Sequence, residues 1–228
     1  MKKILWLFVC CYASQAFSQF AFISDKDGKV NIRTTPTLTD NIEDVLGNGH
    51  LVYCLEFHGN WANIDYTKNG ASTNGYVYKN RLVMIDDFEK IPAYSKQSQL
   101  ISFKKDSIRI TVSTKPFDRS ANRLFYSTEH PDIVELINGK LPFGTDGNIP
   151  RSAYQYIEVQ MGNKLIKLPD IAHDDLFEPT LDNTSVNYDR KQDTLFLQSM
   201  NGDGAGGYLV IWRFVKGEYK DRFIAHGF

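Results

Sequence analysis

Cysteine is scarce in this chain of 228 residues, and its placement excludes an internal disulfide. Cys10 and Cys11 lie in an N-terminal apolar run that we predict to be removed, which leaves Cys54 as the only thiol. A single thiol cannot form an intramolecular disulfide, even in a compartment that permits oxidation. Because Cys54 stands between Tyr53 and Leu55 in a predicted strand, we interpret it as a small buried hydrophobe and not as a reactive thiol.

The chain also lacks a block of basic residues and, beyond its first residues, any long apolar run. Phosphate binding needs clustered cations, so nucleic acid is not a predicted partner. No later run approaches the length of a transmembrane helix. Removing Lys2 and Lys3 from the 26 basic residues leaves 24 against 27 acidic ones, a net charge of about −3. A charge this mild does not favour electrostatic docking to an anionic membrane.

Familiar catalytic and metal-binding motifs are missing as well. Outside the first barrel there is no cysteine nucleophile, and neither His-Glu-x-x-His nor Gly-x-Ser-x-Gly occurs. His130, His173 and His226 stand far apart, and we interpret them as surface histidines. The Asp and Asn residues in the segment 182–193 lack the spacing of a hand-type calcium loop. The sequence therefore predicts no enzyme, no catalytic residue, no metal and no cofactor.

The first residues predict export. A basic start, Met1-Lys2-Lys3, precedes a short apolar run, and Ala16-Phe17-Ser18 supplies small residues where a signal peptidase requires them. We predict a signal peptide over residues 1–18, cleavage before Gln19, and a periplasmic or secreted protein. A lipoprotein is the alternative, because Cys10 follows an apolar run. It is disfavoured because the residue before a lipidated cysteine is normally small, and Val9 is not.

The stretch 28–83 carries the most specific pattern of the chain. It reads Gly28-Lys29-Val30-Asn31-Ile32-Arg33-Thr34-Thr35-Pro36, then Leu51-Val52-Tyr53-Cys54-Leu55, then Gly59-Asn60-Trp61-Ala62-Asn63-Ile64, and finally Gly75-Tyr76-Val77. Short apolar alternations separated by Gly, Asn and Pro predict the strands of a small barrel. Residues 19–84 resemble the bacterial SH3 domain family, whose members run Val-Asn-Val-Arg-Ser-Gly-Pro, Gly-x-x-Val, Trp-x-x-Val and Gly-Trp-Val. This chain has Tyr76 where the family usually has Trp.

The resemblance implies a module that binds cell-wall peptide or glycan. The barrel is rich in aromatic residues beside a predicted exposed loop over residues 65–74. Aromatic rings with polar edges stack on sugar faces and on apolar peptide side chains. We therefore predict Tyr66, Tyr76 and Trp61 as ligand-binding residues, although Trp61 is also expected to pack inward as the first residue of a core strand.

The remainder of the chain predicts a second β domain. Residues 85–98 contain charges and one proline but no sustained hydrophobic period, so we interpret them as a linker. Over residues 99–228, alternating segments such as Ile108, Ile110 and Val112 predict antiparallel strands. The run 208–215 is apolar without alternation, which predicts a central strand covered on both faces.

One short helix is expected within that domain. Asp170 can cap it, and it would extend to Phe177 before Pro179 ends it. The predicted fold class is thus mainly β, with an SH3-like small barrel followed by a mostly antiparallel β domain. That domain loosely resembles an uncharacterised domain of exported bacterial proteins, and the likeness implies no activity.

A glycine-rich run, Gly202-Asp203-Gly204-Ala205-Gly206-Gly207, matches the dinucleotide-binding fingerprint by letter. That fingerprint requires a following helix, whereas a β-type run follows here, so we interpret the run as a hairpin loop. Its four glycines exceed the needs of a tight turn and let another backbone come close. We predict Asp203 and Gly204 as ligand-binding residues, on a surface shared with the neighbouring loop 144–150. A wide hairpin with a bulge is the alternative.

These observations predict an exported, non-enzymatic binding protein whose barrel recognises cell-wall peptidoglycan. The alternative is a protein-interaction role, as an inhibitor or immunity-type partner of another exported protein. A third hypothesis is a cell-wall hydrolase of unrecognised type, because bacterial SH3 modules are often attached to such enzymes. The missing catalytic motifs disfavour it.

Overall fold

The computed structural model describes residues 19–202 and 204–226, so the predicted signal peptide, residues 1–18, lies outside the described residues. Of the described residues, 58% are in strands and 8% are helical, and these helical residues are in short 3₁₀ turns, which confirms the prediction of a mainly β protein. No helix in the described ranges is long and apolar enough to span a membrane.

The N-terminal region is one antiparallel sheet of seven strands, sheet A, curled into a half-barrel with strand order β3-β2-β6-β5-β4-β1-β7. Its strands are β1 (Gln19–Ile23), β2 (Lys29–Arg33), β3 (Ile42–Gly47), β4 (Leu51–His58), β5 (Trp61–Lys68), β6 (Ala71–Tyr78) and β7 (Leu82–Met84), and the turn η1 (Lys79–Arg81) precedes β7. Alternate residues of each strand point inward. Val30, Ile32, Val52, Ile64 and Val77 therefore form part of one buried core.

Two five-stranded antiparallel sheets make up most of the second region. Sheet B has the order β19-β18-β17-β16-β8, and sheet C has the order β15-β14-β11-β10-β9. The strands of sheet B are β8 (Glu89–Lys90), β16 (Thr184–Asp189), β17 (Thr194–Asn201), β18 (Tyr208–Val215) and β19 (Glu218–Ala225). Those of sheet C are β9 (Ala93–Gln97), β10 (Leu100–Lys105), β11 (Ile108–Pro116), β14 (Ser152–Met161) and β15 (Lys164–Lys167).

A small hairpin and several 3₁₀ turns complete the second region. The hairpin pairs β12 (Leu124–Tyr126) with β13 (Val134–Ile137) and projects as an arm from the end of sheet C. The turns are η2 (Ile85–Asp87), η3 (Arg119–Ala121), η4 (Asp170–Ala172), η5 (Leu181–Asn183) and η6 (Gly204–Gly206). The prediction of a short helix from Asp170 to Phe177 is corrected to the single turn η4, which has no side-chain cap.

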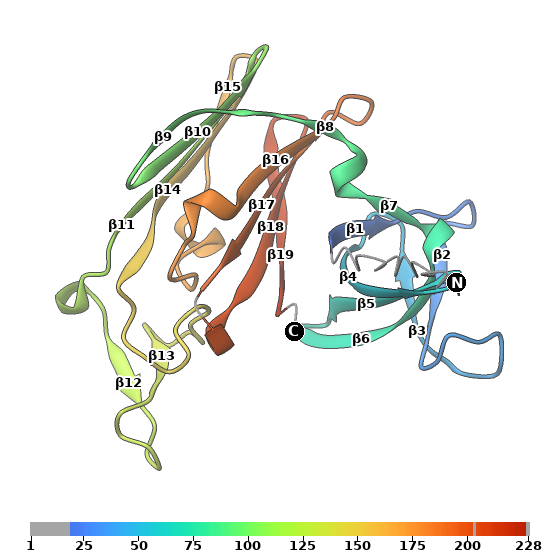
Figure 1. Ribbon diagram of the computed structural model, residues 1–228, viewed down its shortest axis with the longest axis horizontal. Helices are drawn as coiled ribbons and strands as arrows, with labels where there is room; N and C mark the ends of the chain where they lie inside the picture. The colour runs from blue at the N-terminus through green and yellow to red at the C-terminus, as the bar shows by residue number, and fades with distance from the viewer. Residues whose placement is uncertain (1–18, 203, 227–228) are drawn as a thin grey trace, which may run out of the picture.

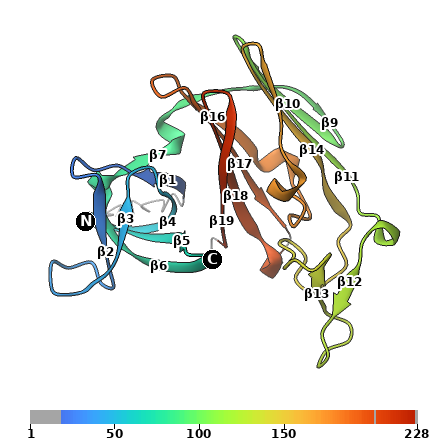
Figure 2. The ribbon, with the colours of Figure 1, turned by 180° about the vertical axis from the view of Figure 1, so that it is seen from behind.

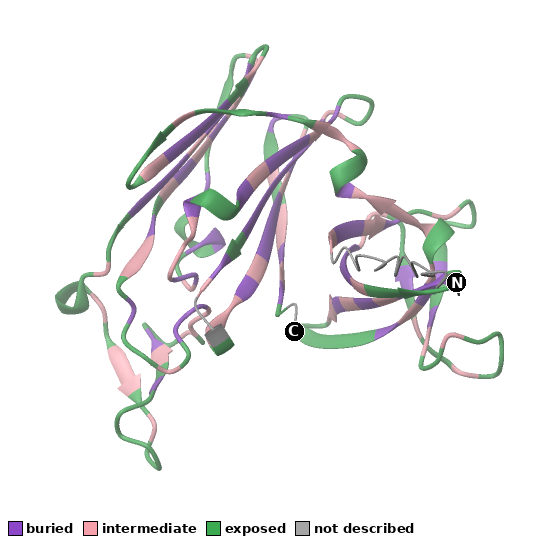
Figure 3. Cartoon of the chain, viewed as in Figure 1, coloured by how far each residue is buried: buried purple, intermediate pink, exposed green. Residues whose placement is uncertain are grey.

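Sheet B is the middle layer of the molecule, between the half-barrel on one side and sheet C on the other (Figures 1 and 2). Successive side chains of a strand point to opposite faces of its sheet. In β18, Tyr208, Val210 and Trp212 join the core toward sheet C, whereas Ile211 joins the cluster that faces the barrel. Figure 3 shows buried positions concentrated along the strands of this layer. The predicted double coverage of residues 208–215 is confirmed.

The segment 85–98 differs from the irregular linker that we predicted. It contains η2, β8 and β9, with β8 paired to β16 and β9 paired to β10, so it contributes an edge strand to each of the two sheets. Ile85 and Ile91 are fully buried and anchor it. Both strands are short and lie at sheet edges, so only isolated positions need apolar residues and no periodic pattern is visible in the sequence.

Aromatic side chains make most of the contact between the barrel and sheet B. Phe22 of the barrel stacks on Phe88 and on Phe196, with ring centroids 6.1 Å apart in both pairs, and Phe88 and Phe196 are 5.7 Å apart. Phe20 packs edge-on against Phe223 of β19 at 6.0 Å. Offset and edge-to-face pairs of this kind add to the free energy gained by burying the rings.

One polar contact accompanies these rings. The Arg213 guanidinium of β18 donates a hydrogen bond to the Gly49 carbonyl of the barrel at 2.7 Å, and Asp221 pairs with the same guanidinium. The guanidinium of Arg213 thus contacts the barrel while its charge remains paired with Asp221 of sheet B.

We predict that Phe196→Ala lowers the free energy of unfolding by about 3–5 kcal/mol, the range for emptying a buried aromatic site. Urea denaturation would measure it. Leu165→Ala is the control, because Leu165 is 70% exposed on β15 and its removal should change stability by less than about 0.5 kcal/mol. A loss below about 1 kcal/mol for Phe196→Ala would contradict close packing of the barrel on sheet B.

Candidate functional site

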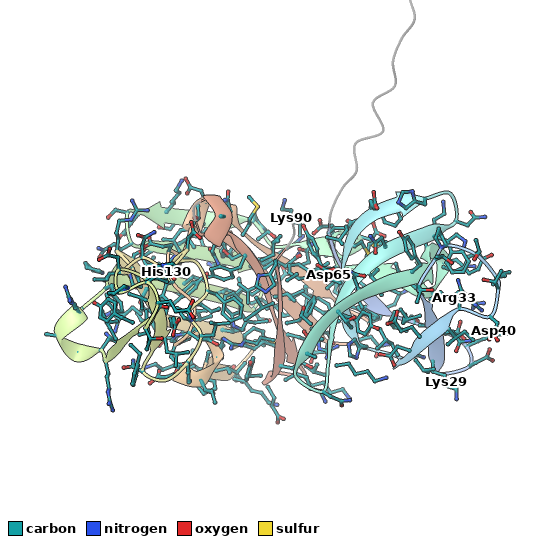
Figure 4. All side chains as sticks on the ribbon, turned by 90° about the horizontal axis from the view of Figure 1, so that it is seen from below. Lys29, Arg33, Asp40, Asp65, Lys90 and His130 are labelled. Atoms are coloured by element: carbon teal, nitrogen blue, oxygen red, sulfur yellow. The ribbon has the colours of Figure 1, made fainter. Side chains whose placement is uncertain are left out.

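A groove of about 320 Å³ opens on the barrel, and its lining joins aromatic, aliphatic and charged side chains. Its residues come from the turn between β1 and β2, from β2, from the loop 34–41, from the start of β5, from the end of β6 and from η1. Figure 4 shows Lys29 and Arg33 at the end of the molecule that is remote from sheet B, together with Asp40. Here we call it the barrel groove. Its lining residues are Asp25, Asp27, Lys29, Val30, Asn31, Arg33, Leu38, Trp61, Val77, Tyr78 and Arg81.

Two aromatic rings form the floor of the barrel groove. Trp61 is the first residue of β5 and is directly opposite Tyr78, the last residue of β6, in the strand register. Their ring centroids are 4.1 Å apart. Trp61 is only 8% exposed, yet it belongs to the groove and not to the apolar cluster inside the barrel. The pair therefore presents a fixed aromatic surface to the groove.

The exposed loop 34–41 forms one rim of the barrel groove. Arg33 holds this loop, because its guanidinium donates to the Thr39 carbonyl at 2.7 Å and to the Asn41 side chain at 2.8 Å. Leu38, near the tip of the loop, is 70% exposed and lines the groove. An apolar side chain held over an aromatic floor is a contact surface for a ligand with an apolar part.

The charges of the barrel groove are of both signs. Asp25 and Arg81 form an ion pair at 2.5 Å, and the Asp25 side chain is 4% exposed, so this pair is structural. Within residues 19–202 and 204–226, neither the Lys29 ammonium nor the Asp27 carboxylate has a hydrogen bond or an ion pair. One cation and one anion thus remain available beside the aromatic floor.

The other barrel residues that we predicted to bind a ligand lie elsewhere. Tyr66 is 1% exposed and faces the barrel core, where its hydroxyl donates a hydrogen bond to Asp44 at 3.2 Å. The prediction that its ring lies on the surface and binds a ligand is therefore wrong. Tyr76 is half-buried and packs beside the ring of His58. In β6 it lies between the buried residues Gly75 and Val77, so its side chain points away from the barrel core. Of the three predicted aromatic residues, Trp61 alone lines the barrel groove.

Sequence reasoning did not select Lys29, Leu38 or Tyr78 as binding residues. Lys29 lies within the motif that ends at Pro36, Leu38 follows that motif, and Tyr78 directly follows Gly75-Tyr76-Val77. Their proximity to Trp61 follows from the pairing of β5 with β6 and from the fold of the loop 34–41. The only signal in the sequence was that all three stand within or next to the recognised motifs.

The second predicted surface is formed by the loops 144–150 and 202–207, and the structure brings these loops into contact. A Cβ atom added to Gly206 would lie 2.8 Å from the Asp146 backbone nitrogen, and one added to Gly144 would lie 2.4 Å from the Phe177 carbonyl oxygen. Gly144 also has a positive φ of 96°. Glycine is therefore required at both positions by the close approach of backbone.

Two hollows flank this contact and share Gly144, Thr145, Asp146 and Ala205. The larger, about 570 Å³, is walled mainly by apolar residues of β13, the segment 141–143 and Tyr208. The smaller, about 390 Å³, adds Arg151 and Glu178. Gly204 opens η6 between them, and Asp203 lies outside the described residues. Because η6 leads directly into β18, the run has no helix that could carry a dinucleotide phosphate, as expected.

The histidines and the cysteine do not assemble into a metal or nucleophile site. In the described part of the chain, no three His, Cys, Asp or Glu side chains are grouped as metal ligands would be. Burial raises the pKa of the Cys54 thiol to about 12, so it remains protonated, and its interpretation as a buried hydrophobe is confirmed. His173 is 6% exposed, which corrects the expectation that it lies on the surface.

Comparisons of this chain with models of protein families, with curated proteins and with solved structures found no match.

We predict that Gly206→Ala destabilises the protein by about 1–3 kcal/mol, because the added methyl group forces two backbone segments apart. Gly47→Ala is the matched control. Gly47 has no positive φ, and the nearest heavy atom to an added Cβ is 3.9 Å away, so this change should be close to neutral. Thermal unfolding of both variants would measure the difference, and equal melting temperatures would show that the two loops do not pack closely.

We predict that buried His173 makes the stability of the protein depend on pH. Burial lowers the pKa of His173 below its ordinary value of 6.5, with smaller opposing effects of Asp170 and Asp174. The unfolded chain therefore takes up this proton at a higher pH than the folded protein does. The contribution of His173 to stability is complete above pH 6.5 and is lost as the pH falls below it. Burial lowers the pKa of His50 in the same direction.

Urea denaturation between about pH 7.5 and pH 5.5, on either side of the histidine pKa, tests this. His173→Gln should reduce the loss of stability on acidification, and His50 accounts for part of the loss that remains. His130→Gln, on the exposed arm between β12 and β13, is the control and should behave as the wild type. An undiminished pH dependence in His173→Gln would refute the assignment.

Proposed function

We propose that this chain is an exported, non-enzymatic binding protein whose barrel groove recognises the peptide or glycan of the bacterial cell wall. The observation that carries the proposal is the composition of the groove, where the paired rings of Trp61 and Tyr78 lie beside the exposed side chain of Leu38. The resemblance of residues 19–84 to bacterial SH3 modules and the predicted signal peptide support it. The ligand would be met outside the cytoplasm.

The barrel groove suits a ligand that has both apolar and charged parts. A sugar face or an apolar peptide side chain can stack on the floor, since aromatic rings bury area with little loss of side-chain entropy. A carboxylate of the ligand can reach Lys29, and an amine can reach Asp27. Wall peptides supply both groups, whereas the wall glycan supplies hydroxyl and acetamido groups but no free amine, so the charges favour the peptide.

Binding in such a groove requires no chemical step. Stacking and charge pairing in the groove need no nucleophile or general base, and the structural ion pair of Asp25 with Arg81 occupies the most buried carboxylate of the groove. We therefore propose recognition without turnover.

Co-sedimentation with purified peptidoglycan tests the proposal at about 0.15 M salt, where weak surface charge effects are screened. The wild type should pellet with the sacculi. Lys29→Glu and Leu38→Asp should each raise the Kd for the sacculi about tenfold, the effect of losing roughly 1.4 kcal/mol of binding free energy, and so lower the pelleted fraction. Both residues are exposed, so neither change should affect folding.

Matched controls are present in the chain. Lys26→Glu makes the same change of charge in the turn that precedes β2, outside the groove. Leu165→Asp alters a leucine that, like Leu38, is 70% exposed, but on sheet C. Both controls should pellet as the wild type does. If all variants pellet equally, the barrel groove is not the wall-binding site, and release of muropeptides by the purified protein would refute a purely binding role.

A second candidate function is a protein-interaction role, as an inhibitor or immunity-type partner of another exported protein. The observation that favours it is the apolar hollow of about 570 Å³ between β13 and the glycine loops, with Leu141 and Ile133 exposed at its edge. Exposed apolar patches on monomers often mark sites of protein association. Failure of the wild type to pellet with peptidoglycan would favour this candidate over the wall-binding one.

A further inference from the structure

A cavity of about 530 Å³ opens in the second region, between the ends of β11 and β14, the turn η3 and the segment 170–177. We call it the His173 cavity. Its volume lies within the range of about 300–1,000 Å³ that is usual for small-molecule sites. It shares no lining residue with the barrel groove. The chemistry of its lining side chains determines which ligand it can bind.

The floor of the His173 cavity is buried and aromatic. Tyr154, Phe177 and His173 are all at least nine-tenths buried and line the cavity. Phe117 packs edge-on against Phe177, with 5.6 Å between ring centroids, and the rings of Tyr154 and His173 are 6.2 Å apart. Such a floor offers flat apolar surface to the C–H face of a ring.

The walls are held in place from behind. In the segment 170–177, Asp175 pairs with both terminal nitrogens of Arg222, and Asp174 pairs with Lys140. The Trp212 indole donates to the Ala172 carbonyl at 2.8 Å. On the opposite wall, Asp118 accepts hydrogen bonds from the backbone of η3. A cavity with fixed walls binds a ligand without the cost of ordering loops.

The rim of the His173 cavity has unused donors and acceptors in about equal number. Gln155 accepts a hydrogen bond from Ser113 through its carbonyl oxygen at 3.1 Å. Among the described residues, its amide nitrogen, the Lys115 ammonium and the Asp170 carboxylate have no hydrogen bond or ion pair. Burial lowers the pKa of His173, so its neutral ring can donate at one nitrogen and accept at the other.

This mixture excludes most ligand classes. An anion could pair with Lys115 but would face Asp170, Asp118 and Asp174. Lys115, Gln155 and Asp170 are exposed, so water solvates them in the free protein. A cation that displaces this water would leave the donors of Lys115 and Gln155 unpaired, and an apolar ligand that covers the rim would remove water without replacing its hydrogen bonds. A hydroxyl group both donates and accepts, so a ring that carries several hydroxyls can satisfy the whole rim.

We propose that the His173 cavity binds a neutral sugar, with a face of the ring against Tyr154 and Phe177 and its hydroxyls on Gln155, Asp170 and His173. The barrel groove plays no part in this binding, so the two proposals stand or fall separately. The cavity therefore makes the second region a ligand-binding unit of its own.

Nuclear magnetic resonance of the purified protein with isotope-labelled histidine tests the proposal. The probes are glucose, galactose, mannose and N-acetylglucosamine, each added to roughly 20 mM, which detects a millimolar Kd. At least one sugar should shift the His173 ring signals in a saturable manner and leave those of His130 unchanged. The His173 signals are identified by their absence from His173→Gln. If no sugar shifts them, the proposal is overturned.

Rim variants make the test specific. Gln155→Ala and Asp170→Ala remove one hydrogen-bonding group each and should weaken binding about 5–10-fold, since each lost bond is worth about 1–1.5 kcal/mol. Both residues are exposed, and unchanged thermal unfolding confirms that the variants fold. Gln97→Ala on β9 and Asp132→Ala on the arm are matched controls that should bind as the wild type does. Equal affinity in all four variants would place the sugar elsewhere and refute the assignment.

Discussion

The packing of the half-barrel on sheet B is the contact on which the rest of the structure depends. Phe22, Phe88 and Phe196 stack in the middle of this interface, and they come from the first strand, from the segment after the barrel and from the central sheet. These positions are far apart in the chain, so their burial ties its beginning to its end. A buried aromatic side chain is worth several kilocalories per mole, which makes this cluster the strongest link between the two regions.

The same contact determines where ligands can bind. Sheet B packs against the barrel on one face and against sheet C on the other, so much of its surface is covered. Open sites are therefore at the ends of the layers. The barrel groove lies at the end of the barrel remote from sheet B, and the glycine loops and the His173 cavity lie beside the arm of β12 and β13. The edges of rigid sheets hold such sites without deforming the core.

Sequence reasoning predicted the elements whose pattern is local. The alternation of Ile108, Ile110 and Val112 identified β11, and the unbroken apolar run 208–215 identified a doubly covered strand, because the period of side chains along a strand is a property of neighbouring residues. The segment 85–98 escaped this reasoning, since short edge strands need no periodic pattern. The predicted helix after Asp170 is a single turn because Asp170 does not cap it and the backbone of His173 leaves the helical conformation.

The sequence by itself determined that the protein is mainly β and that its N-terminal strands form a curled, barrel-like sheet. Only the tertiary structure decided which aromatic residues are accessible. Tyr66 and Trp61 are in the same strand, yet Tyr66 faces the barrel core and Trp61 lies at the floor of the barrel groove. Strand pairing and the path of the loop 34–41 make that difference. The His173 cavity had no sequence motif at all, because its lining residues come from segments far apart in the chain, from Lys115 to Phe177, that only the folded chain brings together.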